Sequence, residues 1–113
     1  MSELSEQPST TGGPLHSTFE ADADMAELIA MFVEELPQRV GELTDAFDRE
    51  DLKALRSLSH QLKGSAGGYG FDVITDAARK LEQAVRDEAD LATLRRSMDE
   101  LMSLCGRAAL PGT

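Results

Sequence analysis

The residues best suited to chemistry lie in a short run that begins at His60 and ends at Ala66. The run belongs to a stretch in which leucine recurs every three or four residues, at Leu52, Leu55, Leu58 and Leu62. This spacing predicts an amphipathic helix from Asp51 to Tyr69. At about 100° per residue, His60 falls about 160° from the middle of the apolar stripe. We therefore expect its imidazole to face water or a partner protein.

The neighbours of His60 on the outer face follow from the same helical spacing. Lys63 lies three residues on, Gly64 lies four residues on, and Gly67 lies two turns away. Each glycine costs a helix about 1 kcal/mol relative to alanine, so an interior Gly64 needs a reason. Its missing side chain would let another macromolecule approach His60 closely. For Gly67 a second interpretation stays open, because the glycines up to Gly70 also fit a helix end.

An exposed imidazole beside an ammonium group suits phosphoryl transfer through histidine. A neutral ring nitrogen is a nucleophile. The Lys63 ammonium would pair with the oxygens of an arriving phosphoryl group. Nearby cations also favour the neutral ring over imidazolium, which keeps the nucleophile available near neutral pH.

This pattern resembles the motif of histidine-containing phosphotransfer (HPt) domains of two-component phosphorelays. The resemblance covers residues 20 to 109, and its defined positions are His60, Leu62, Lys63, Gly64, Ser65, Ala66, Gly70, Leu81 and Glu82. It implies that Nε2 of His60 accepts the phosphoryl group. It also implies a receiver domain of a response regulator, a hybrid histidine kinase, or both as partners. No cofactor is expected on this chain, because the Mg²⁺ would lie on the receiver domain. The resemblance also implies that the chain relays phosphate without being an enzyme.

Three charged residues near the motif each allow two interpretations. Glu82 matches the family position that orients the histidine through its other ring nitrogen, but it also fits a solvated residue at the edge of a helix. Arg79 would reach the phosphoryl group or pair with Asp76 three residues before it. Arg56 would bind acids of a partner or only solvate the helix. With Gly64 and Gly67, the two arginines form the expected docking surface.

The remaining sequence predicts an all-α fold. Apolar spacing indicates helices over residues 22–36, 37–49 and 51–69, followed by two more that start near residues 72 and 90. Pro37 cannot continue a helix smoothly but fits the first position of a new one. We therefore expect an antiparallel four-helix bundle with an additional N-terminal helix. The expected boundaries are a disordered tail over residues 1–17, the bundle over 18–110 and a short tail over 111–113.

Composition narrows the functional classes. The formal net charge is −10, all of it within residues 1–50, which carry twelve acids and two arginines, so nucleic-acid binding is not expected. The first twenty residues lack the pattern of a signal peptide, and no apolar run is long enough to span a membrane. Cys105 is the only cysteine, so an intrachain disulfide is impossible. These features predict a cytoplasmic monomer without a metal site or an ATP-binding loop.

Two other functional classes fit the sequence less well than a phosphorelay protein. An adaptor could keep the bundle and bind a receiver or a histidine kinase without relaying phosphate, although the intact set of His60, Lys63 and Gly64 argues against it. A metal-dependent hydrolase would need several His, Asp or Glu side chains that converge inward, whereas the inner helix faces are apolar.

Overall fold

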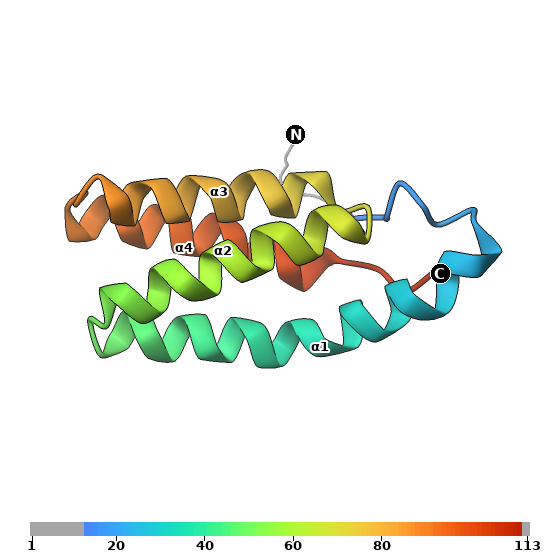
Figure 1. Cartoon of the computed structure of the whole chain (residues 1–113), viewed down its shortest axis with the longest axis horizontal. Coiled ribbons are helices and arrows are strands. Elements are labelled where there is room, and N and C mark those ends of the chain that lie inside the picture. Colours follow the sequence, from blue (N-terminus) through green and yellow to red (C-terminus); the bar gives the residue numbers. More distant parts are fainter. Residues whose placement is uncertain (1–12, 112–113) are drawn as a thin grey trace, which may run out of the picture.

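The protein is a bundle of four antiparallel helices, described by a computed structural model over residues 13–111. The helices are α1 (Ala23–Asp48), α2 (Leu52–Gly68), α3 (Asp72–Arg86) and α4 (Leu91–Arg107). Consecutive helices pack against each other, and α4 returns to pack against α1 (Figure 1). The prediction of an all-α bundle is confirmed, and no helix of the described part combines the length and apolarity needed to cross a membrane.

The predicted additional N-terminal helix is wrong, because Pro37 lies inside one continuous helix of 26 residues. Figure 1 shows α1 as a single unbroken ribbon. An interior proline removes one backbone hydrogen bond and costs a helix about 3 kcal/mol. Leu36 and Leu43, on either side of it, are fully buried in the same core. Their burial holds both halves of α1 on one axis and offsets the cost of Pro37.

Carboxylates cap three of the four helices. The side chains of Asp22, Asp51 and Asp90 accept hydrogen bonds from backbone N–H groups in the first turns of α1, α2 and α4. Such a cap contributes about 1 kcal/mol to helix stability. In α3, Asp72 is the first helical residue, where its charge complements the helix dipole.

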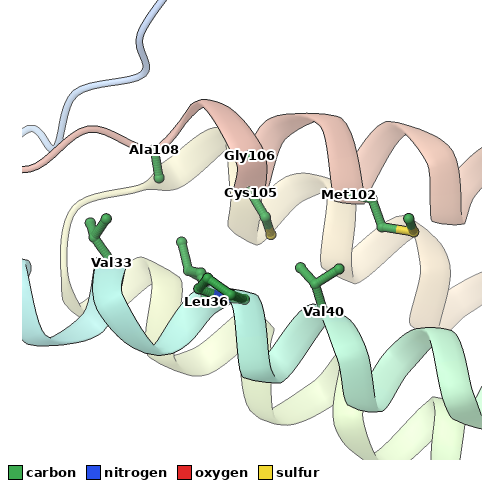
Figure 2. A pocket seen from close by; sticks show the side chains of 8 residues that line it. Val33, Leu36, Val40, Met102, Cys105, Gly106 and Ala108 are labelled. Carbon is green, nitrogen blue, oxygen red and sulfur yellow. The ribbon is translucent and has the colours of Figure 1, made fainter.

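The core is built from aliphatic side chains of all four helices and a small aromatic group at one end. Phe32 of α1 stacks on Tyr69 and Phe71, which flank the turn between α2 and α3, with ring centroids 5.0 and 5.7 Å apart. The aromatic group therefore fixes the end of α2 against α1. Between α1 and α4 lies an apolar hollow, where Val33, Leu36 and Val40 face Met102 and Cys105 (Figure 2).

Residues 13–17, which belong to the expected tail, contact the bundle in this structure. The N–H of Leu15 donates to the carbonyl of Arg107, and the hydroxyl of the buried Ser17 donates to the carbonyl of Tyr69. Gly70 has a φ of +85°, and a side chain there would collide with the Ser17 hydroxyl. Residues 1–12, the rest of the expected tail, lie outside the described residues, as do residues 112 and 113.

Candidate functional site

His60 lies in the middle of α2 with its side chain 64% exposed, as the leucine spacing predicts. On the opposite side of the helix, Leu55, Leu62 and Ala66 are fully buried in the core. The imidazole is therefore accessible to another molecule while its backbone is held by the packing of α2.

Glu82 of α3 contacts the imidazole of His60. Its side chain is only 5% exposed, and its Oε2 atom lies 3.0 Å from Nδ1 of His60. Glu82 thus makes the contact that an orienting residue needs, although the sequence also allowed a solvated glutamate. A carboxylate only accepts hydrogen bonds, so Nδ1 carries the proton in this contact. The remaining nitrogen, Nε2, keeps its lone pair, and this is the tautomer that a nucleophile requires.

Lys63 binds the second oxygen of the same carboxylate. Its Nζ atom donates to Oε1 of Glu82 at 2.8 Å, and its side chain is 30% exposed. A second cation, Arg86, lies one turn beyond Glu82 on α3, with a guanidinium nitrogen 3.4 Å from Oε2. The hydrogen bond from Lys63 is the main cause that lowers the pKa of Glu82; burial opposes it, and the contact with His60 adds to it. The carboxylate therefore stays ionised at neutral pH and remains an acceptor for Nδ1.

A close approach of α2 and α3 sets these distances. The hydroxyl of Thr75 on α3 donates to the carbonyl of Lys63 at 3.0 Å. A side chain on Gly67 would come within 3.2 Å of the same hydroxyl. Gly67 therefore lies where the two helices approach each other, which gives it a packing reason that the sequence did not reveal.

Gly64 lies in a different environment from Gly67. It is exposed, and a Cβ atom there would have no heavy atom within 4 Å. It lines an open hollow beside His60, together with Met25 and Leu28 of α1 and Tyr69 at the end of α2. The surface on this side of the imidazole is thus recessed and partly apolar.

The two arginines of the expected docking surface have different surroundings. Arg79 is exposed on α3 and pairs with Asp76, one of the two alternatives that the sequence left open. Arg56 is exposed on α2 and lines a second hollow that contains His60 and Glu82. The structure brings Lys63, Glu82 and Arg56 close to His60, whereas Arg79 lines neither hollow.

Sequence reasoning missed Arg86 and Thr75. Arg86 follows Glu82 by four residues on a helix, and this spacing could have indicated an ion pair. Thr75 carried no such signal, because its contact with Lys63 depends on how α2 and α3 align. No group of three His, Cys, Asp or Glu side chains is arranged to hold a metal within the part of the chain that the structure describes.

Comparison with known proteins adds one match. The family model described as "Hpt domain" matches residues 27–109, a span that includes all four helices except the first turn of α1. The searches of curated proteins and of solved structures found no match.

Proposed function

The chain belongs to the Hpt domain family, and we propose that His60 exchanges a phosphoryl group with the aspartate of a receiver domain. Domains of this family serve phosphotransfer in two-component systems. Within that general role, the hydrogen bond between His60 Nδ1 and the buried Glu82 carboxylate carries the assignment to His60. It leaves the lone pair of Nε2 on an exposed ring, where a partner can present its phosphoryl group.

The chain would contribute a nucleophile of fixed orientation. Nε2 attacks the phosphorus atom of a phospho-aspartate, an N–P bond forms, and the P–O bond to the aspartate breaks. The proton stays on Nδ1, where Glu82 accepts its hydrogen bond and stabilises the positive charge that develops on the ring. The Mg²⁺ of the reaction would be held by the receiver domain.

Further parts of the proposal concern the partner and the cellular setting. The open hollow beside Gly64 supports docking of a receiver domain or a hybrid histidine kinase on that side of His60. We propose a monomeric, cytoplasmic module that relays phosphate without an ATP-binding site of its own.

The test uses all receiver domains of the source organism, each phosphorylated beforehand with radiolabelled phosphate. At least one should transfer label to the wild-type chain, and the label should be lost in acid and retained in base. His60→Gln should accept none while keeping wild-type helicity by circular dichroism, because the side chain lies outside the core. Stable binding of a phosphorylated receiver without transfer would identify an adaptor and overturn the proposal.

A further inference from the structure

The distribution of unpaired cations distinguishes one side of His60. All eleven lysines and arginines lie within residues 13–111, and nine of them contact a carboxylate, a hydroxyl or a carbonyl of the chain. Among the described residues only Lys53 and Arg56 have no such partner. The two cations of the described part that lack any such partner therefore both lie on the helix that carries the nucleophile.

Both cations line the same hollow as His60. Its lining residues are Lys53, Arg56, Ser57, His60, Glu82 and Arg86. Arg56 precedes His60 by four residues and Lys53 by seven, so the three side chains follow one face of α2. At a rise of 1.5 Å per residue, Arg56 lies about 6 Å and Lys53 about 10 Å from His60 along the axis. Both long side chains can reach an anion that is bound beside the imidazole.

The negative charge in this hollow is already neutralised. Glu82 is its only carboxylate, and His60, Lys63 and Arg86 all contact the oxygens of that group. Lys63, which the motif suggested as the phosphoryl partner, is thus engaged by Glu82. Lys53 and Arg56 are the cations that can bind a new anion without first breaking an ion pair.

We propose that Lys53 and Arg56 form an oxyanion site for the phosphoryl group on His60. This inference rests on the proposed function and assigns to these two residues the charge stabilisation that the motif suggested for Lys63. Each would donate charge-assisted hydrogen bonds to the phosphoryl oxygens during transfer and in the phosphohistidine product.

The test uses phosphoramidate, a small donor that removes any effect of protein docking. Nε2 attacks the phosphorus atom, the N–P bond to His60 forms and the P–N bond of the donor breaks. Ammonia leaves because the donor nitrogen is already protonated, and the proton on Nδ1 of His60 stays on the ring. The double variant Lys53→Ala, Arg56→Ala should be phosphorylated at least about tenfold more slowly than wild type, because the loss of even one charge-assisted hydrogen bond accounts for a factor of this size. Two single variants at position 56 are compared as well. Arg56→Lys keeps the charge and should be phosphorylated at close to the wild-type rate, whereas Arg56→Ala should be slower.

A second readout separates this site from a general effect of charge. In ³¹P NMR titrations the second pKa of the phosphoryl group on His60 should be higher in the double variant than in wild type. The reason is that Lys53 and Arg56 favour the dianion of this group. The matched control is Lys80→Ala, which removes an exposed cation of α3 that lies 3.9 Å from Glu100. It should leave both the rate and the titration unchanged.

Three outcomes would count against the inference. A double variant that matches Lys80→Ala in rate and titration would overturn the oxyanion site alone. A double variant that reacts normally with phosphoramidate but slowly with a phosphorylated receiver would make Lys53 and Arg56 docking residues and overturn it as well. A wild-type chain that takes no phosphoryl group from any donor would overturn the proposed function, and this inference with it.

Discussion

At the scale of single residues, the site depends on one buried carboxylate whose two oxygens have different partners. One oxygen of Glu82 accepts from His60 and the other from Lys63. Lys63 keeps the carboxylate ionised, and the carboxylate keeps the proton of His60 on Nδ1. A solvated glutamate could not hold the ring in this way, because its side chain would sample many rotamers.

Replacing Glu82 should slow the chemistry without preventing it. Glu82→Ala removes the acceptor of Nδ1, so the ring rotates and populates both tautomers. We expect phosphorylation of His60 to slow by about tenfold or more, in line with losses seen when the partner of a functional histidine is removed. Glu82→Gln keeps an acceptor oxygen and should lose less. The rate of labelling by a phosphorylated receiver measures both, and an unchanged rate in Glu82→Ala would remove Glu82 from the mechanism.

Glu82 should also link stability to pH. Its pKa in the folded protein is lower than its ordinary value of 4.5, so the unfolded chain binds the proton more tightly. The stability contributed by ionised Glu82 is therefore fully present above pH 4.5 and is lost as the pH falls through the lowered pKa. Urea unfolding should show wild type more stable than Glu82→Gln at pH 7, with the difference narrowing below pH 4.5. A difference that does not vary with pH would contradict this assignment.

At the scale of the elements, the glycines in and just after α2 serve different purposes. Gly64 has open space around it, Gly67 lies against Thr75, and Gly70 has a positive φ beside Ser17. Like Gly64, Gly68 has open space where a Cβ atom would lie, but it is the last residue of α2, whereas Gly64 lies in the interior of that helix. Packing within the described part of the chain does not account for the cost of Gly64, so we attribute it to an approaching partner.

Gly64→Leu should therefore separate stability from function. A Cβ atom meets no neighbour there and leucine favours the helix, so the free energy of unfolding should rise by up to about 1 kcal/mol. Transfer from a receiver should be blocked, because the new side chain fills the hollow beside His60. Gly70→Ala is the matched contrast, since strain and collision should destabilise it. Normal transfer in Gly64→Leu would show that the hollow is not a docking surface.

The elements also show how far sequence reasoning extends. The leucine spacing predicted α2 and the outward direction of His60, because one face of that helix must be buried. Pro37 misled the prediction, since a local rule for proline was weaker than the burial of Leu36 and Leu43 around it. The contact of Lys63 with Glu82 joins residues nineteen positions apart, and only the alignment of α2 with α3 reveals it.

At the scale of the whole molecule, the residues that hold the site in place are distinct from the residue that reacts. The core and the Phe32 stack fix the two helices that carry His60 and Glu82, while the reactive ring extends outside the core. Cys105, the only cysteine, is buried in the core, and burial raises the pKa of its thiol to about 11. The thiol is therefore protonated at neutral pH and adds apolar packing rather than a second nucleophile.

The position of the phosphoryl group on the ring tests the central claim most directly. The chain would be labelled with ¹⁵N-histidine, phosphorylated, and studied by NMR through the coupling of phosphorus to the ring nitrogens, with His60→Gln to assign the signal. We predict a phosphoryl group on Nε2 of His60, with the proton on Nδ1. A phosphoryl group on Nδ1, on His16, which is the other histidine of the sequence, or on no histidine would contradict the role given to the contact between His60 and Glu82.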